Sequence, residues 1–442
     1  MAYEFTKIPE HWSIKKMPEV VKWGSGGTPK ATEKAYYENG TIPWLIIGDL
    51  NDGIVTESAT KITESGLENS SAKMIPAGTL LVAMYGSIGK LGITGIECCT
   101  NQAIAYAKRL YGVTTKFMFY YMALIKSELI SMGKGGTQKN ISQTVLNSLR
   151  VPVPPIEEQE RIVAKIEELF SELDNGVETL RKTKQQLAVY RQAVLKKAFE
   201  GAYTKQWRKD NQYITPLDDF NAIKKWNPIY KDTSGDETEI HLALPKSWLK
   251  IRMGDVFEVE VGATPSRRIA EYWDGDIAWV SSGEVHFNTI FETDECITQD
   301  GLDHASTNVQ PVGTIMLAMI GEGKTRGQAA ILNLPAAHNQ NTAAILVSKT
   351  PCQPKYIYYF LQMNYDHTRR VGSGNNQKAL NKERVRALRF PFASFAEQTV
   401  IVQEIEARLS ACDNIEKTVD TALQQAEAMR QSILKQAFEG RI

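Results

Sequence analysis

The sequence predicts an α+β fold of two similar globular domains separated by two long antiparallel coiled-coil helices, with pseudo-two-fold symmetry. Three observations lead to this prediction. The chain has 442 residues, more than one hydrophobic core normally serves. A long stretch with helical periodicity occurs twice. A mixed pattern of short apolar segments and glycine-rich turns precedes each copy, as expected for two α+β domains.

The first long helix is predicted within residues 151–201. Pro152, Pro154 and Pro155 favour extended backbone just before a helix start. Acidic residues follow in the expected first turn and Lys196 and Lys197 lie in the last, which suits the helix dipole. Ten positions of this stretch follow one another at the 4-3-4-3 spacing that is typical of a coiled coil, and eight of them are apolar. The ten residues are Ile162, Ile166, Leu169, Leu173, Gly176, Leu180, Thr183, Leu187, Tyr190 and Val194.

The second long helix is predicted within residues 391–442. When the sequence is aligned with itself at an offset of 239 residues, Pro152 matches Pro391. The same offset aligns the Ala-Phe-Glu-Gly that ends the first stretch with the Ala-Phe-Glu-Gly that ends the second. Because a helix with one apolar stripe needs a partner, each copy is expected to pair with the other in antiparallel orientation. At a rise of ~1.5 Å per residue, the pair would form a spacer of roughly 60 Å. The apolar stripe of the second helix, called its seam, is interrupted only at Arg408. The seam consists of Ile401, Ile405, Cys412, Ile415, Val419, Ala422, Ala426, Met429 and Ile433.

The globular domains are predicted at residues 1–150 and 245–390. In the first, strands are expected at 44–47, 80–84 and 104–107, and a helix near 115–130. The second domain repeats the landmarks of the first: Trp12 corresponds to Trp248, Gly27-Thr28-Pro29 to Ala263-Thr264-Pro265, and Asn101-Gln102 to Asn339-Gln340. Residues 202–244 are polar and lack periodicity, which predicts a linker with loose turns.

Composition restricts the class of protein. The five cysteines include no Cys-x-x-Cys pair, and the six histidines show no metal-binding spacing, so neither a disulfide framework nor a metal site is expected. Cys98 and Cys99 are expected to be packed rather than reactive. No signal peptide or membrane-spanning segment is recognisable, and a cytoplasmic location is expected.

The sequence contains no complete catalytic motif. Gly321-Glu322-Gly323-Lys324-Thr325 is similar to the end of a P-loop, but Ala318 stands where that motif requires a glycine. Asn227-Pro228-Ile229-Tyr230 resembles an amino-methyltransferase motif, yet it lies in the polar linker without an upstream glycine-rich cofactor loop. We therefore expect no catalytic residues, no metal and no cofactor in this chain.

Local basic loops indicate a nucleic-acid surface, although the formal net charge is zero. Arg and Lys neutralise phosphates, and Arg, Asn and Gln can contact base edges in the major groove. A single loop of this kind is also compatible with an ordinary solvated surface, but such loops recur at matched places in both halves. The predicted DNA-binding residues are Lys30, Lys34, Ser87, Lys90, Lys134, Thr137, Gln138, Lys139, Asn140, Arg267, Arg268, Lys324, Thr325, Arg326, Arg369, Arg370, Asn375, Asn376, Gln377 and Lys378.

The repeat also suggests which residues distinguish the two halves. Residues common to both, such as Asn101 and Asn339, are expected to serve backbone shape or phosphate contact. Residues that differ at matched loops are expected to read different sequences. Ser87-Ile88 against Glu322-Gly323 is one such pair, and Gly136-Thr137 against Asn375-Asn376 is another.

Over essentially its full length the chain resembles the specificity subunits of type I restriction–modification systems. The most specific similarity lies in the two helix entries, VPVPPIEEQERIVAKIEELF and FPFASFAEQTVIVQEIEARL, and the two helix exits, LKKAFEG and LKQAFEG. The domain entries PEHWSIKKMPEV and PKSWLKIRMGDV and the linker start AYTKQWRKD are similar too. The resemblance implies two target recognition domains, each reading half of a bipartite, asymmetric DNA target. The paired helices would set the gap between the half-sites.

The resemblance also implies partners. In that family the specificity subunit has no catalytic site and binds two modification subunits and two restriction subunits. S-adenosylmethionine, ATP and magnesium would then act in those partner subunits. Two other functions remain open: a coiled-coil scaffold that does not bind DNA, and, with least support because its motifs are missing, a stand-alone methyltransferase or nuclease.

Overall fold

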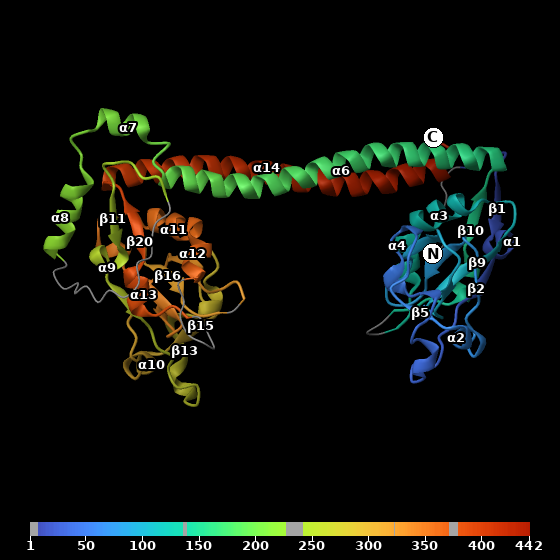
Figure 1. Cartoon of the computed structure of the whole chain (residues 1–442), viewed down its shortest axis with the longest axis horizontal. Helices are drawn as coiled ribbons and strands as arrows, with labels where there is room; N and C mark the ends of the chain where they lie inside the picture. Colours follow the sequence, from blue (N-terminus) through green and yellow to red (C-terminus); the bar gives the residue numbers. More distant parts are fainter. Residues whose placement is uncertain (1–7, 136–138, 227–241, 322, 371–378) are drawn as a thin grey trace. The chain divides into compact units, whose positions relative to one another are not determined.

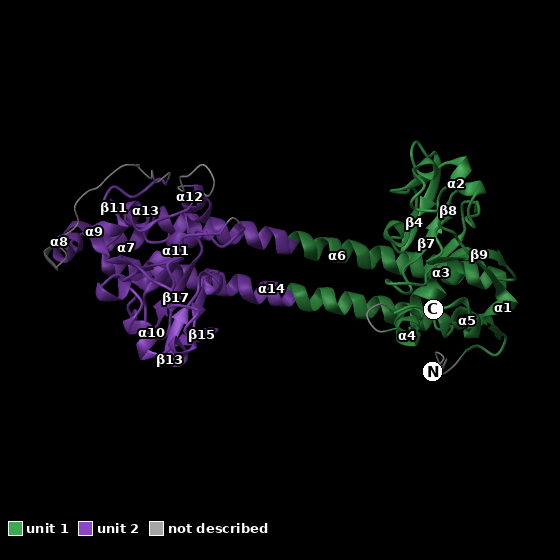
Figure 2. Cartoon of the chain, turned by 90° about the horizontal axis from the view of Figure 1, so that it is seen from below, with its two compact units in different colours: residues 1–182, 419–442 green, residues 183–418 purple. Residues whose placement is uncertain are grey.

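The structure is a computed structural model that describes residues 8–135, 139–226, 242–321, 323–370 and 379–442 (Figure 1). The chain divides into two compact units, coloured separately in Figure 2. Unit 1 comprises residues 1–182 and 419–442, and unit 2 comprises residues 183–418. Each unit therefore holds one globular domain together with a segment of each long helix.

The domain of unit 1 is built on three small sheets. A five-stranded sheet has the order β2-β9-β6-β7-β4, a three-stranded sheet the order β5-β3-β8, and β1 pairs with β10. The strands are β1 (Ser13–Lys16), β2 (Val21–Ser25), β3 (Ile42–Leu45), β4 (Gly53–Val55), β5 (Lys61–Ile62), β6 (Leu80–Ala83), β7 (Leu91–Thr94), β8 (Cys99–Thr100), β9 (Ile104–Leu110) and β10 (Arg150–Val153).

Short helices surround these sheets, and aromatic side chains of α3 enter the core. The α-helices of the domain are α1 (Met17–Val20), α2 (Glu64–Glu68), α3 (Thr115–Leu124), α4 (Lys126–Met132) and α5 (Gln143–Ser148), with 3-10 turns η1 (Lys34–Tyr36) and η2 (Ile47–Asp49). The side chains of Phe117, Tyr121 and Met122 are buried on α3. The predicted strands are thus confirmed within two or three residues. The helix predicted at 115–130 is present as two consecutive helices that meet at Ile125.

Unit 2 repeats the strand order of unit 1. Its sheets run β12-β19-β16-β17-β14, β15-β13-β18 and β11-β20. The strands are β11 (Leu249–Arg252), β12 (Val259–Val261), β13 (Trp273–Val280), β14 (Asn288–Ile290), β15 (Glu295–Ile297), β16 (Ile315–Ala318), β17 (Ala329–Leu332), β18 (Ala337–His338), β19 (Thr342–Ile345) and β20 (Arg389–Phe392). The predicted duplication of the domain is therefore confirmed at the level of sheet topology.

The helices of unit 2 complete the repeat. They are α9 (Met253–Val256), α10 (Gln299–Asp303), α11 (Pro354–Met363), α12 (Tyr365–Arg370) and α13 (Lys382–Ala387), with 3-10 turns η3 (Ala270–Tyr272), η4 (Ser282–Glu284) and η5 (Val347–Lys349). Two further helices, α7 (Lys205–Asp210) and α8 (Pro216–Trp226), occupy the segment predicted as loose turns. That prediction was wrong there because α8 gains tertiary contacts: Ile223 is buried in the core of unit 2.

The two long helices are α6 (Ile156–Phe199) and α14 (Phe395–Phe438). In unit 1 the first turns of α6 share a core with the last turns of α14, since Ile162 and Ile166 pack in the same cluster as Leu434 and Phe438. Farther along, Asp174 of α6 forms an ion pair with Arg430 of α14. The two segments therefore run antiparallel in unit 1.

Unit 2 contains the complementary segments. There the end of α6 packs with the start of α14, because Leu195 and Phe199 share a core with Ile401 and Ile405. Arg191 pairs with Asp413 at 2.6 Å and with Glu416 at 2.8 Å. The predicted antiparallel pairing is confirmed within each unit.

The predicted seam is only partly correct. Tyr190 is 50% exposed, Ile415 47% and Met429 55%, although all three were expected to face the partner helix. Arg191, one residue after Tyr190, faces α14 instead. The physical reason is that an α-helix has 3.6 residues per turn, so a strict 3.5-residue repeat drifts around the helix unless the pair supercoils.

Candidate nucleic-acid interface

The candidate interface lies on corresponding turns of the two units. In unit 1 the turn between β6 and β7 (residues 84–90) lies beside the segment that follows α4. Ile141 N donates to Met84 O at 2.9 Å, and Gly86 N donates to Lys139 O at 3.3 Å. Backbone bridges also join Asn140 to Tyr85 and to Lys134. The structure thus brings together the predicted residues Ser87, Lys134, Lys139 and Asn140.

Three other predicted lysines of unit 1 have different surroundings. Lys90 is half-buried, and its Nζ donates to Ile47 O at 3.3 Å and to Gly48 O at 3.4 Å. Lys30 and Lys34 are exposed on a separate loop, where Lys34 begins the turn η1 beside α2. Lys30 and Lys34 therefore belong to a different loop from Lys134 and Lys139.

The residues shared by the two halves hold loops in place. In unit 1, Asn101 Oδ1 accepts from Ala103 N at 3.1 Å, and Thr28 Oγ1 donates to Gln102 Oε1. In unit 2, Asn339 Oδ1 accepts from Asn341 N at 3.0 Å. The Thr28 bond also recurs there, as Thr264 Oγ1 donates to Gln340 Oε1 at 2.5 Å. These polar side chains stabilise backbone shape, one of the two roles expected for them.

In unit 2 the turn between β16 and β17 (residues 319–328) is longer and contains two cationic residues instead of one. Lys324 is exposed, Thr325 half-buried and Arg326 buried at 9% exposure. The hydroxyl of Tyr365 on α12 donates to Lys324 O, and Arg369 Nη1 donates to the same hydroxyl at 2.7 Å. The turn and α12 are therefore braced together and gather the predicted cations Lys324, Arg326 and Arg369, with the exposed Arg370 on the same helix.

The two predicted arginines that precede η3 differ in their contacts. Arg267 forms a two-bond ion pair with Glu295, and its guanidinium lies 3.8 Å from the ring centre of Trp273. The hydrogen bonds that Arg267 donates to Glu295 raise the pKa of Arg267. Arg268 is exposed, and its side chain forms no hydrogen bond or ion pair with the described residues. Arg268 is thus the more available contact for a polyanion.

Six predicted residues lie outside the described part of the chain: Thr137, Gln138, Asn375, Asn376, Gln377 and Lys378.

Two tyrosines at these turns were not predicted from sequence. Tyr85 is 40% exposed among the cations of unit 1, and Tyr365 connects the basic turn of unit 2 to α12. The comparison of the two halves could have indicated Tyr85, because it aligns with Ile320 next to the differing residues of the matched turns. Tyr365 could not be found in that way, because its role depends on a contact across 41 residues of sequence.

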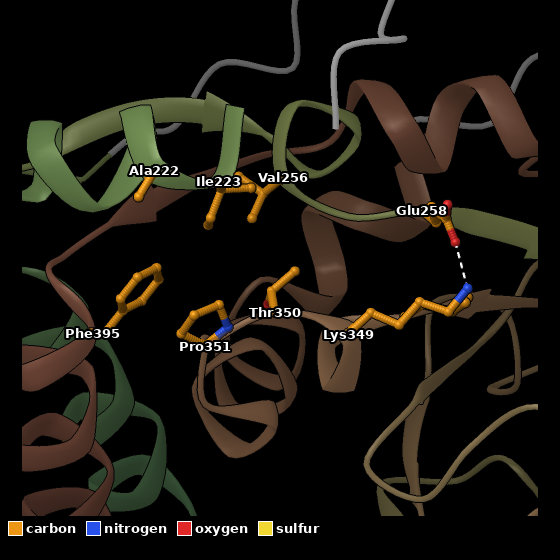
Figure 3. Close-up of a pocket in the computed structure, with 9 residues that line it drawn as sticks. Ala222, Ile223, Val256, Glu258, Lys349, Thr350, Pro351 and Phe395 are labelled. Carbon is orange, nitrogen blue, oxygen red and sulfur yellow. Dashed lines mark hydrogen bonds and ion pairs between the residues drawn. The ribbon is translucent and has the colours of Figure 1, made fainter. Parts of the chain in front are cut away.

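The pocket in Figure 3 lies elsewhere in unit 2 and has no catalytic arrangement. It has a volume of about 500 Å³ and lies between α8 and the domain. Its walls are formed mainly by Ile223, Val256, Pro351 and Phe395, while Glu258 and Lys349 form an ion pair at 2.6 Å on one side. The remaining polar side chain of the lining, Thr350, donates its hydroxyl hydrogen to Val347 O at 2.8 Å, so it is not hydrogen-bonded to Glu258 or Lys349 as an activated nucleophile would be.

Other chemistry is limited in the described part of the chain. No group of three histidine, cysteine, aspartate or glutamate side chains among the described residues is arranged to hold a metal ion. Cys98 and Cys99 are fully buried, and burial raises the pKa of each thiol to about 12, which confirms that they are packed rather than reactive. Within the same residues, no helix combines the length and apolarity needed to cross a bilayer.

Comparison with known proteins gives a consistent result. The family model for the type I restriction modification DNA specificity domain matches residues 9–187 and 245–425. The type I restriction enzyme MjaIX specificity subunit of Methanocaldococcus jannaschii is 24% identical over 364 residues, covering 80% of this chain and 77% of that protein. The type I restriction enzyme EcoBI specificity subunit of Escherichia coli is 26% identical over 446 residues, covering 98% and 87%.

Solved structures show the same fold. A chain from a study of complex assembly and conformational transition of the type I R-M system aligns with a TM-score of 0.70 and 15% identity, covering 99% of this chain and 100% of that one. The HsdS subunit from Thermoanaerobacter tengcongensis aligns with a TM-score of 0.56 and 16% identity, covering 100% of both chains. Since the family match includes both domains and extends into both long helices, this chain belongs to the family of type I restriction–modification specificity subunits.

Proposed function

We propose that this chain is the DNA-recognition subunit of a type I restriction–modification complex, in which each unit binds one half of a bipartite, asymmetric DNA target. One observation carries this proposal. The two units share one sheet topology but present different turns at the same place, residues 84–90 in unit 1 and 319–328 in unit 2. A common scaffold with different loops is what two different half-sites require.

The charges of these turns suit the proposed ligand. Both present lysine or arginine side chains beside polar side chains, the combination that contacts phosphates and base edges. The overall charge of zero suggests that the chain alone binds DNA weakly at physiological salt and gains positive surface from partner subunits.

The chain is proposed to scaffold two modification and two restriction subunits. In unit 1 a groove of about 570 Å³ lies between the edge strand β4, helix α3 and the long helices. Ile54 is 57% exposed in this groove, beside the ion pairs of Lys126 with Asp52 and of Lys116 with Glu167. Apolar surface rimmed by charges is typical of a protein-binding groove. S-adenosylmethionine, ATP and magnesium are proposed to act in the partner subunits, with no catalysis by this chain.

The test is to express the chain with its modification subunit and map adenine methylation in host DNA by single-molecule sequencing. A single bipartite motif with a fixed gap supports the proposal. Methylation at a continuous motif contradicts the assignment of one half-site to each unit. A stable complex without methylation would instead favour the alternative function, a coiled-coil scaffold that does not read DNA.

A matched exchange tests the division between the units. Replacing residues 84–90 by residues 319–328 should change one half of the motif and leave the gap and the other half as they were. An unchanged motif would show that these turns do not read sequence.

A further inference from the structure

Arg326 has an unusual environment for a cation. It lies in the turn between β16 and β17, and only 9% of its surface is exposed. Its Nε is fully buried without a hydrogen-bond partner, and no carboxylate of the described residues forms an ion pair with the guanidinium. A buried charge without a partner is costly, and such groups are normally paired or neutralised. The Nε–H of Arg326 is therefore an unsatisfied donor in the unbound protein.

Unit 1 shows that the fold of the turn does not require this arginine. In unit 1, Gly89 N donates to Ala83 O at 3.0 Å, and in unit 2 the matching bond runs from Gly327 N to Ala318 O at 2.8 Å. The residues just before these glycines are Ile88 and Arg326, which therefore occupy equivalent positions. Ile88 is 4% exposed and packs in the core of unit 1. An apolar side chain satisfies this buried position, so the charge in unit 2 needs another explanation.

This equivalence corrects the expected match of Ile88 with Gly323. That match counted residues forward from the start of the two turns. The turn of unit 2 is longer, so the residues before β17 are matched by counting back from the strand instead.

The surroundings of Arg326 have positive charge. Lys324 is exposed on the same turn, and Arg370 is exposed on α12. Arg369 lies against the turn, since its Cγ is 3.2 Å from the place that a Cβ on Gly327 would take. Among described residues of this turn and α12, the acidic side chain is Asp366, which is exposed to solvent. The field at the turn therefore favours an anion.

We propose that Arg326 is the centre of an anion site in unit 2 that binds one phosphodiester group of the DNA duplex. The proposal rests on the DNA-recognition function above and specifies one contact within it. A phosphate fits better than a base edge, because a buried full charge is offset best by an opposite full charge. Guanidinium groups bind phosphate oxygens through two parallel hydrogen bonds, here from the terminal nitrogens of Arg326, which are not among the fully buried atoms.

The variants that test this site are Arg326→Met and Arg326→Ile, the second of which introduces the residue that unit 1 carries. Lys250→Met is the matched control, since it removes one exposed charge from β11 of the same unit. Each chain is prepared in complex with the modification subunit. Its affinity for a duplex bearing the methylated motif is measured over a series of salt concentrations, and thermal unfolding of the full chain is measured with and without inorganic pyrophosphate.

Both Arg326 variants should bind the duplex about 10-fold more weakly at 0.15 M salt, with the slope of log K against log salt reduced by about 0.9, as for one lost phosphate contact. Their melting temperature without ligand should equal or exceed that of the unchanged protein. Pyrophosphate should stabilise the unchanged protein and the Lys250→Met control but neither Arg326 variant.

Two results would overturn the inference while the proposed function stands. One is unchanged affinity and slope together with a lower melting temperature, which would make Arg326 a structural residue. The other is a changed methylation motif, which would make it a base reader. If the unchanged complex binds no duplex, the proposed function fails, and the pyrophosphate experiment alone decides the site: stabilisation that depends on Arg326 supports it, and its absence refutes it.

Discussion

The ring of Phe438, in the last turn of α14, lies 4.9 Å from the ring of Phe117 on α3, measured between centroids. The same relationship exists in unit 2, where Phe199 at the end of α6 lies 5.0 Å from Tyr356 on α11. Both phenylalanines at the helix ends are fully buried. The end of each long helix is therefore part of the core of one domain, which connects helix pairing to domain folding.

This contact predicts a large loss of stability for Phe438→Ala. Removal of a fully buried phenylalanine leaves a cavity, and the free energy of unfolding should fall by about 4 kcal/mol. Urea unfolding of the full chain measures this change. The control is Val189→Ala on α6, where the side chain is 71% exposed and the change should stay within about 0.5 kcal/mol. Similar effects of both variants would contradict the packing.

The glycines that end the long helices are predicted to resist substitution. Gly440 has φ of 68°, and a Cβ there would overlap the ring of Pro9. Gly440→Ala should therefore destabilise the protein by more than about 1 kcal/mol in urea unfolding. The opposite sign is expected for Gly176→Ala, which lies exposed within α6 with no atom near the added Cβ and should stabilise by roughly 0.5–1 kcal/mol. Equal effects would argue against the left-handed turn.

Two equivalent glutamates should differ in importance. Glu397 is buried, accepts from Trp248 Nε1 at 2.8 Å and pairs with Arg208 of α7 at 2.6 Å. Glu397→Gln breaks a buried ion pair and should lower the free energy of unfolding by about 3 kcal/mol.

The control is Glu158→Gln in unit 1. Glu158 accepts from Trp12 Nε1 at 3.1 Å and lies 2.8 Å from Nε2 of His11, whose side chain is 60% exposed. Burial opposes ionisation of Glu158, but the hydrogen bonds from His11 and Trp12 outweigh it and lower its pKa. The loss of free energy of unfolding on Glu158→Gln should therefore be smaller, below about 1 kcal/mol. A larger loss for Glu158→Gln than for Glu397→Gln would contradict the assignment.

His338 predicts an acid sensitivity of unit 2. Its ring is fully buried, and burial lowers its pKa from 6.5 to about 4. Because the unfolded chain binds the proton more readily, stability is full above pH 6.5 and is lost as the pH falls towards 4. The contribution amounts to roughly 3 kcal/mol across this window.

The variant His338→Thr introduces the residue found at the equivalent Thr100 of unit 1. Urea unfolding between about pH 7 and pH 4 should show a weaker pH dependence for this variant than for the unchanged protein. Parallel curves would show that His338 does not titrate as its burial implies.

The lysines of unit 1 should not contribute equally to DNA affinity. Lys134 lies beside Asn140, whereas Lys90 donates to two backbone carbonyls. In the complex with the modification subunit, Lys134→Ala should weaken duplex binding several-fold and reduce its salt dependence. Lys90→Ala should change affinity less and lower the melting temperature instead. The reverse order would place the interface on another face of unit 1.

Local pattern was sufficient for much of the fold. The turns around Gly78 and Gly86 and the apolar residues between them predicted the strand now seen as β6. The aromatic run from Phe117 was correctly predicted as a helix, and the helix faces a core. Such features depend on neighbours along the chain, so the linear pattern of residues is enough to predict them.

The candidate site was less predictable. Lys90 and Arg267 look like free cations in sequence, yet one binds backbone carbonyls and the other pairs with Glu295. Arg326 appears as one more basic residue of a loop, and only its burial distinguishes it. The partners of these side chains come from distant parts of the chain, so residue type alone could not separate them.

The sequence by itself determined the duplication, the two long helices and their glycine stops, because repeats, apolar periodicity and capping residues are properties of the linear chain. Only the tertiary structure decided that the end of each long helix enters a domain core and that α7 and α8 fold onto unit 2. It also decided that Ile88 and Arg326 occupy equivalent buried positions. Burial and pairing arise from what surrounds a residue in space, and that is set only when distant segments pack together.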